Sequence, residues 1–124
     1  MQGYTVSVVE TSKELTGKQK IQLKDTTDCV RLDQATLEGN VIIDVDFWAE
    51  LAIHNEKSDD KDYTNYVVVD KSGVRYVTGS EAFWSAFRNI FDDMSECDEE
   101  WTLKVYRKPS KNRQGKDFIT CSVL

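Results

Sequence analysis

A long alternation of apolar and polar residues runs through positions 41–54 of the chain. Every odd position in this stretch is apolar, and the even positions are mostly charged or polar, with Ile42 and Ala52 as the exceptions. Successive side chains of a β-strand point to opposite faces, so this period predicts one long strand, or two strands joined by a bend. The odd face is expected in the core, which restricts the chain to a mainly β fold.

Shorter stretches with the same period predict further strands. Residues 18–24 are read as a strand with Ile21 and Leu23 on one face, after a turn at Thr16-Gly17. Residues 33–40 are read as a turn or a single helical turn, and residues 71–73 as the turn of a hairpin in which Gly73 supplies positive φ. The other predicted strands are residues 5–10, 29–33, 63–70, 74–78, 101–108 and 117–123.

One segment has helical spacing. Thr78 and Glu81 match a capping box, in which an N-cap hydroxyl and an acidic residue three positions later satisfy free backbone N–H groups. Apolar residues then recur with a period near 3.6, which predicts a helix packed on the core. This stripe consists of Phe83, Trp84, Phe87, Ile90, Phe91 and Met94.

The order of these elements predicts an OB-like five-stranded antiparallel barrel with the helix between the third and fourth strands. A small α+β sheet with one packed helix is the alternative, since periodicity does not establish closure. The 124 residues fit a single domain spanning positions 1–124. No apolar run reaches the roughly 20 residues of a membrane span, and no secretory signal is present, so we expect a cytoplasmic protein.

The residues do not suggest catalysis, a cofactor or a metal. His54 is the only histidine, and the three cysteines (Cys29, Cys97 and Cys121) are far apart, so no zinc pattern exists. We read the cysteines as reduced thiols, with Cys121 in the core. Three acids on one face of the 41–54 strand are interpreted as a solvated surface rather than a metal site; these are Asp44, Asp46 and Glu50.

Charge is distributed unevenly. The chain has a net charge of −6, but residues 104–116 contain six basic residues and no acid. The rest of the chain carries 10 basic and 22 acidic residues, which is a net charge of −12. Fields decay over about 10 Å at 0.1 M salt, so a basic segment can hold phosphate although the whole chain is acidic.

Two aromatic residues lie at the two roots of the loop in this segment: Tyr106 near the start of the segment and Phe118 just after its end. Both have the parity that points away from the core, and neighbouring strands would bring the rings together. Cations along the backbone and rings for base stacking are what single-strand binding requires. The predicted nucleic-acid contacts are Lys104, Tyr106, Arg107, Lys108, Lys111, Arg113, Lys116 and Phe118. Trp48 is a second candidate ring, but its acidic neighbours favour a packing role.

Three stretches carry a resemblance: Ile53-His-Asn-Glu-Lys-Ser58, Tyr76-Val-Thr-Gly-Ser80 and Pro109-Ser-Lys-Asn-Arg-Gln-Gly-Lys-Asp-Phe-Ile-Thr-Cys121. From about Lys24 to the end, the chain resembles small proteins of tailed bacteriophages that infect Gram-positive hosts. Some of these are described as single-stranded DNA-binding proteins with OB-type folds. The resemblance implies a role in phage replication or recombination inside the infected bacterial cell.

The leading hypothesis is therefore a binder of single-stranded DNA with little sequence preference. The alternative is a phage-encoded inhibitor of a host defence protein that presents acidic surface as a nucleic-acid mimic. That surface would comprise Asp59, Asp60, Asp62 and residues 92–100. A third hypothesis is a scaffold for replication or recombination proteins without nucleic-acid contact. A homodimer is compatible with each of them.

Overall fold

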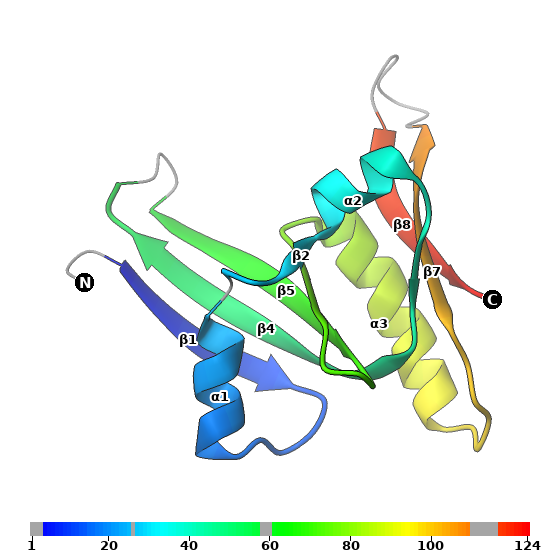
Figure 1. The fold of residues 1–124 in the computed structure, drawn as a ribbon, viewed down its shortest axis with the longest axis horizontal. Coiled ribbons are helices and arrows are strands. Elements are labelled where there is room, and N and C mark those ends of the chain that lie inside the picture. The colour runs from blue at the N-terminus through cyan, green and yellow to red at the C-terminus, as the bar shows by residue number, and fades with distance from the viewer. Residues whose placement is uncertain (1–3, 26, 58–60, 110–116) are drawn as a thin grey trace. The chain divides into compact units, whose positions relative to one another are not determined.

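Two sheets and three helices make up the part of the chain that the computed structural model describes, namely residues 4–25, 27–57, 61–109 and 117–124 (Figure 1). The chain divides into two compact units, and neither is a continuous segment. Residues 1–30 and 46–79 form the first unit, and residues 31–45 and 80–124 form the second. Each unit is described by itself below.

The first unit contains a five-stranded sheet with strand order β1-β4-β5-β6-β2 and one helix, α1. β1 is antiparallel to β4, and their register shifts between Val8 and Glu10, which marks a β-bulge. β5 is antiparallel to β6. The elements are β1 (Tyr4–Thr11), α1 (Gly17–Lys24), β2 (Val30–Arg31), β4 (Val45–Asn55), β5 (Asp62–Asp70) and β6 (Arg75–Thr78).

The odd positions of β4 form the centre of this unit's core, as the alternation predicts. Phe47, Ala49 and Leu51 are buried together with Leu23 of α1 and with apolar residues of the neighbouring strands. The even positions are mixed, because Trp48 is only 3% exposed while Asp46 and Ala52 are exposed. The packing role that we expect for Trp48 is therefore confirmed, and its ring does not offer an open stacking surface.

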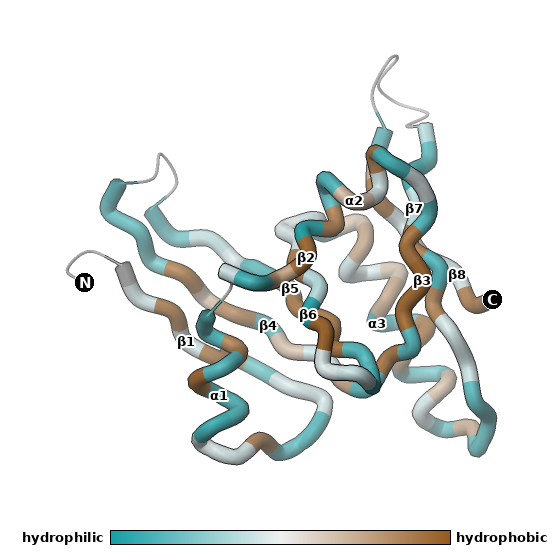
Figure 2. Tube along the Cα trace, viewed as in Figure 1, coloured by the Kyte–Doolittle hydropathy of each residue, from teal (hydrophilic) through white to brown (hydrophobic). Residues whose placement is uncertain are grey.

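The second unit contains a three-stranded sheet with order β3-β7-β8 and two helices. β7 is antiparallel to both of its neighbours. Figure 2 shows β3 as hydrophobic. The elements are α2 (Leu32–Glu38), β3 (Val41–Ile43), α3 (Glu81–Ser95), β7 (Leu103–Pro109) and β8 (Asp117–Val123).

One face of the three-stranded sheet is the interior face of this unit. Leu103 and Val105 of β7 are fully buried, and their partners across the ladders point the same way. On the helices, Leu32, Phe83 and Phe87 are fully buried as well. Aromatic contacts continue along α3 from Phe83 through Phe87 and Phe91 to Trp101, with ring centroids 5.8 to 6.1 Å apart. The first half of the predicted apolar stripe is thus core, since Phe83, Trp84 and Phe87 are buried, whereas Ile90, Phe91 and Met94 are half-buried.

The predicted barrel is wrong. The described residues form three helices instead of one, and the two sheets that they form do not close into a barrel. The alternative of one sheet with one helix has too few of both. The alternating segment 41–54 is interrupted at the exposed residue Asp44, which separates β3 from β4. These two strands join different sheets, and this is why no single barrel forms. The bend was anticipated, but the separation of its two strands was not.

The strand predicted at residues 18–24 is the helix α1. Thr16 accepts a hydrogen bond from the Gln19 backbone, and the Gln19 side chain accepts one from the Thr16 N–H, so the helix begins with a capping box. The Lys, Gln and Leu residues that follow are good helix formers. Ile21 is 71% exposed while Leu23 is buried, so the two do not share a face.

Three smaller predictions also change. Most of the segment 33–40, expected as a turn or a single helical turn, belongs to the seven-residue helix α2 (Leu32–Glu38). Only Val30–Arg31 of the predicted strand 29–33 pair in a sheet. Helix α3 begins later than the sequence suggests, because its N-cap is Ser80, whose Oγ accepts a hydrogen bond from the Phe83 N–H at 3.1 Å. The hairpin across residues 71–73 is confirmed, with Gly73 at φ +95°.

Candidate nucleic-acid interface

Four predicted contact residues lie on one face of the β7–β8 hairpin, and we call them the platform: Lys104, Tyr106, Lys108 and Phe118. Lys108 lies directly opposite Phe118, and Tyr106 lies opposite Thr120, two residues further along β8. Paired residues of an antiparallel ladder point to the same side of the sheet. The predicted outward parity of Tyr106 and Phe118 is therefore confirmed.

The two rings are diagonal neighbours. Tyr106 and Phe118 occupy positions whose Cα atoms in such ladders are about 7–8 Å apart, within reach for aromatic side chains. Both side chains are half-buried, and they lie on the face opposite the buried residues Val105 and Ile119. On the same face, Ile42 of β3 lies opposite Lys104 and is 51% exposed, so the platform continues onto the third strand.

Lys104 contacts the ring of Tyr106. Its Nζ lies 5.1 Å from the ring centroid, which is cation–π distance. The lysine therefore lies against the ring on which a base would stack, while Lys108 is exposed beside Phe118. Each ring thus has a cation as a close neighbour, which places positive charge within reach of the phosphates of any stacked nucleotide.

Arg107 points to the opposite face, where it connects the hairpin to α2. Its Nε donates a hydrogen bond to Thr36 Oγ1 at 3.1 Å, and its Nη2 donates to the Asp33 carbonyl at 2.5 Å. Nη1 forms an ion pair with Asp117 at 2.8 Å. The side chain is 22% exposed. Arg107 therefore serves the packing of the second unit and does not join the platform.

The remaining predicted contacts are Lys111, Arg113 and Lys116. These residues belong to segment 110–116, which lies outside the described residues. The described part of the hairpin contributes Lys104, Lys108 and the engaged Arg107 to the basic segment.

The acidic surface of the competing hypothesis divides between the units. Asp62 is exposed in the first unit, while Asp59 and Asp60 lie outside the described residues. In the second unit, the acids between the end of α3 and β7 are all exposed; these are Glu96, Asp98, Glu99 and Glu100. An acidic surface segment is thus present at residues 96–100.

A charged cluster that the sequence did not reveal surrounds His54 at the end of β4. Its Nδ1 lies 2.7 Å from Asp62 Oδ1, and its Nε2 lies 2.6 Å from Glu56 Oε1. Both hydrogen bonds favour the imidazolium and raise its pKa, with Asp62 as the larger cause. Glu56 also pairs with Lys61 at 3.3 Å, and its pKa is lowered mainly by the bond from His54. This cluster joins the ends of β4 and β5.

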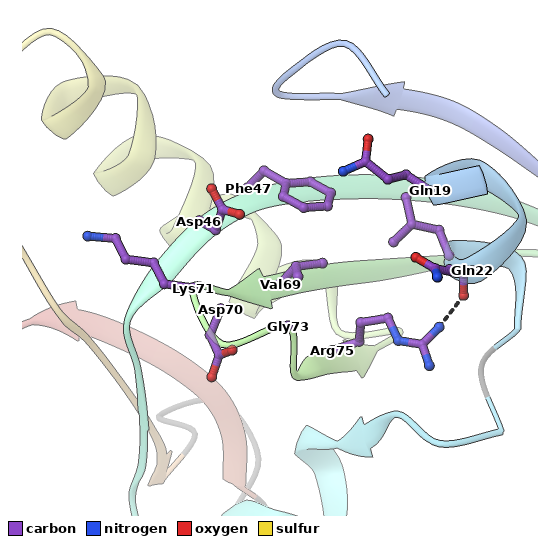
Figure 3. A pocket seen from close by; sticks show the side chains of 10 residues that line it. Gln19, Gln22, Asp46, Phe47, Val69, Asp70, Lys71, Gly73 and Arg75 are labelled. Carbon is purple, nitrogen blue, oxygen red and sulfur yellow. Dashed lines mark hydrogen bonds between the residues drawn. The ribbon is translucent and has the colours of Figure 1, made fainter. Parts of the chain in front are cut away.

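A cavity of about 400 Å³ lies between α1 and the β5–β6 turn (Figure 3). Phe47 and Val69 line it from the sheet. The Arg75 guanidinium donates hydrogen bonds to the Gln22 and Asp25 carbonyls at the end of α1, the first of which is drawn in Figure 3. Asp70 Oδ1 accepts bonds from the turn that it begins. Arg75 and Asp70 therefore hold the helix and the turn in place.

Of the three acids on one face of the 41–54 strand, Asp44 and Asp46 are exposed and Glu50 is half-buried. Asp46 pairs with Lys13 at 3.5 Å. Within residues 4–25, 27–57, 61–109 and 117–124, no group of three His, Cys, Asp or Glu side chains could hold a metal ion. Of the cysteines, Cys121 is buried as predicted, and burial raises the pKa of its thiol to about 12.

Comparison with known proteins leaves the resemblance to phage proteins a prediction. The chain matches no protein-family model, no curated protein and no solved structure. Among the described residues, no helix combines the length and the apolar character needed to cross a membrane.

Proposed function

We propose that this protein binds single-stranded DNA with little sequence preference, and that it does so on the platform of the three-stranded sheet. The observation that carries the proposal is the diagonal placement of Tyr106 and Phe118 on a sheet face with Lys104 and Lys108 beside them. The resemblance to phage single-strand binders suggests a role in replication or recombination. An open sheet face replaces the barrel groove that the sequence suggested.

The energetics of such a site come from two additive sources. Stacking of a base on an aromatic side chain contributes roughly 1–3 kcal/mol and tolerates any base, since every base has a π-face. The lysines contribute a salt-dependent term that reads no sequence. With two rings and two described lysines, the platform suits a short stretch of nucleotides, with weak base preference and strong dependence on ionic strength.

Fluorescence anisotropy with labelled oligo-dT tests the proposal. We expect binding at low salt, with log K falling against log salt by about 0.7 per phosphate contacted. Tyr106→Ala and Phe118→Ala should each weaken binding about 5- to 150-fold and leave the salt slope unchanged, because stacking is lost while the charges remain. Lys108→Ala should instead reduce the slope of log K against log salt.

Tyr63→Ala is the matched control. Tyr63 is a half-buried tyrosine on β5 of the first unit and is not part of the three-stranded sheet. Its removal should leave DNA binding unchanged. Absence of binding to oligo-dT at low salt, or equal losses for Tyr63→Ala and Tyr106→Ala, would contradict the platform.

A second candidate function is the acidic nucleic-acid mimic, which the exposure of Glu96, Asp98, Glu99 and Glu100 favours. This reading places the function on the acidic segment and predicts no affinity for oligo-dT. Charge reversal at these residues would then abolish the inhibition of a DNA-binding target, and Tyr106→Ala would leave the inhibition unchanged.

A further inference from the structure

A groove runs along the outer edge of the five-stranded sheet, between β1 and α1. It has a volume of about 410 Å³ and is lined by residues 7–11 of β1 together with Lys20 and Lys24 of α1. β1 is the first strand in the sheet order, and in the described part of the chain it pairs only with β4. Its other side is therefore a strand edge, to which an extended segment can add.

The groove is basic and partly apolar. Helix α1 carries Lys18, Lys20 and Lys24 and no acid, in a chain with a net charge of −6. Val9, at the bulge of β1, is 57% exposed in the groove. Among the described residues that line it, Glu10 is the one acid, so these residues keep a net positive charge. An extended segment with acidic side chains complements this surface.

The chain itself contains such a segment. Residues 98–102 connect α3 to β7 without helix or strand, and Asp98, Glu99 and Glu100 are all exposed. We infer that residues 98–100 of a second copy dock along the β1 edge, so that this protein associates with itself through an acidic segment and a basic groove.

The spacing of the charges fits this docking. Alternate residues of an extended segment point to one side and are about 6.6 Å apart, which applies to Asp98 and Glu100. Lys20 and Lys24 are one helical turn apart, with Cβ atoms separated by about 5–6 Å. Both ion pairs can therefore form together. Because the bulge between Val8 and Glu10 interrupts regular pairing, the ion pairs must supply much of the specificity.

Such a contact joins two different surfaces. Copies joined in this way either form a closed ring, of which a dimer is the smallest, or assemble head to tail into an open chain. Self-association through this contact needs no ligand. If the protein also binds single-stranded DNA as proposed, propagation would make neighbouring copies bind cooperatively, which is common among single-strand binders.

Sedimentation velocity of the full chain without nucleic acid tests the inference. At about 50 mM NaCl we expect reversible, concentration-dependent species of at least twice the 14.2 kDa chain mass. These species should be lost at about 500 mM NaCl, where screening is stronger. A protein that stays monomeric at low salt at every concentration overturns the inference.

Charge reversal identifies the two surfaces. Lys20→Glu/Lys24→Glu and Asp98→Lys/Glu100→Lys should each weaken association at least about tenfold, because they replace attraction with repulsion. An equimolar mixture of the two variants should restore association. Lys18→Glu is the matched control, since Lys18 lies on the same helix but does not line the groove, and it should leave association unchanged. Equal loss with Lys18→Glu, or no restoration in the mixture, overturns the docking.

Two safeguards keep the test decisive. The reversed residues belong to different units, so if one variant fails to fold by circular dichroism, the other still reports on the contact. Anisotropy with oligo-dT is measured in parallel. Self-association without DNA binding rejects the proposed function alone, and non-cooperative DNA binding by a monomer rejects this inference alone.

Discussion

At the scale of single residues, the titration of His54 makes the stability of the folded protein depend on pH. Its imidazole bridges Asp62 and Glu56, and these hydrogen bonds raise its pKa above the ordinary value of 6.5. A group whose pKa is higher in the folded state stabilises that state below its unfolded pKa, and the contribution disappears as pH rises through the folded pKa. The stabilisation by His54 is therefore lost in a pH range that begins near 6.5.

We predict that the stability of the wild-type protein falls with rising pH in this window. The His54→Gln variant should lose that part of the pH dependence, since glutamine does not titrate. Urea unfolding at a series of pH values measures the effect, and an NMR titration of the His54 ring should give a midpoint above 6.5. A midpoint at or below 6.5 would contradict the two-carboxylate bridge.

Residue patterns predicted some of these positions and missed others. The parity of β7 and β8 placed Lys104, Tyr106, Lys108 and Phe118 on one face, because alternation follows from local strand geometry. The same parity places Arg107 with Leu103 and Val105, on the interior face, and this signal was available in the sequence. The His54 cluster was not predictable, because Asp62 reaches His54 only through the pairing of β4 with β5.

At the scale of elements, Arg107 is the link between the hairpin and α2. Its guanidinium donates hydrogen bonds to Thr36, the Asp33 carbonyl and Asp117, which anchors the loop end of the hairpin to the helix. The platform lies on the other side of the same strands. Arg107 is therefore expected to support the platform's position by holding β7, without contacting DNA itself.

We predict that Arg107→Ala destabilises the protein by about 1–3 kcal/mol, since partly buried hydrogen-bonding groups lose a charged partner. Arg107→Lys should fall between alanine and the wild type, because one ammonium cannot reach all three partners. Urea unfolding measures both variants. At temperatures where the protein stays folded, the salt slope of oligo-dT binding should not change. A reduced slope with unchanged stability would place Arg107 in the DNA interface instead.

Helix α1 shows how an element can be misassigned. Its two apolar residues, Ile21 and Leu23, have the spacing of a strand face, yet only Leu23 enters the core. The capping box at Thr16 and Gln19 was a stronger signal than a two-residue alternation, because it satisfies the free backbone N–H groups of a helix start. For α3, where six apolar residues repeat, periodicity alone identified the helix and its buried side.

At the scale of the whole molecule, the chain passes between the two units at residues 30–31, 45–46 and 79–80. The second unit depends on this interleaving. Leu32 of α2 and Ile43 of β3 are fully buried, yet they lie far in sequence from α3, β7 and β8. A fragment that begins at Ser80 therefore lacks one edge strand and one covering helix.

We predict that the isolated fragment 80–124 does not fold, although it contains the whole platform. Its NMR spectrum should lack dispersed amide signals, and it should bind oligo-dT more weakly than the full chain, because the rings are no longer held on a sheet. The full-length Phe118→Ala variant is the comparison for the fragment, because it keeps β3 and is expected to stay folded while it lacks one ring of the platform. A dispersed spectrum for fragment 80–124 would show that α2 and β3 are dispensable.

The sequence by itself determined the local properties of this protein: the strand character of β4, β7 and β8, the β5–β6 turn at Gly73, the apolar side of α3 and the outward parity of Tyr106 and Phe118. Only the tertiary structure decided which sheet each strand joins and that Arg107 holds a helix. The physical reason is the sequence separation of the residues that interact. Side-chain alternation and capping depend on a few neighbouring residues, whereas strand partners depend on contacts between residues far apart in the chain.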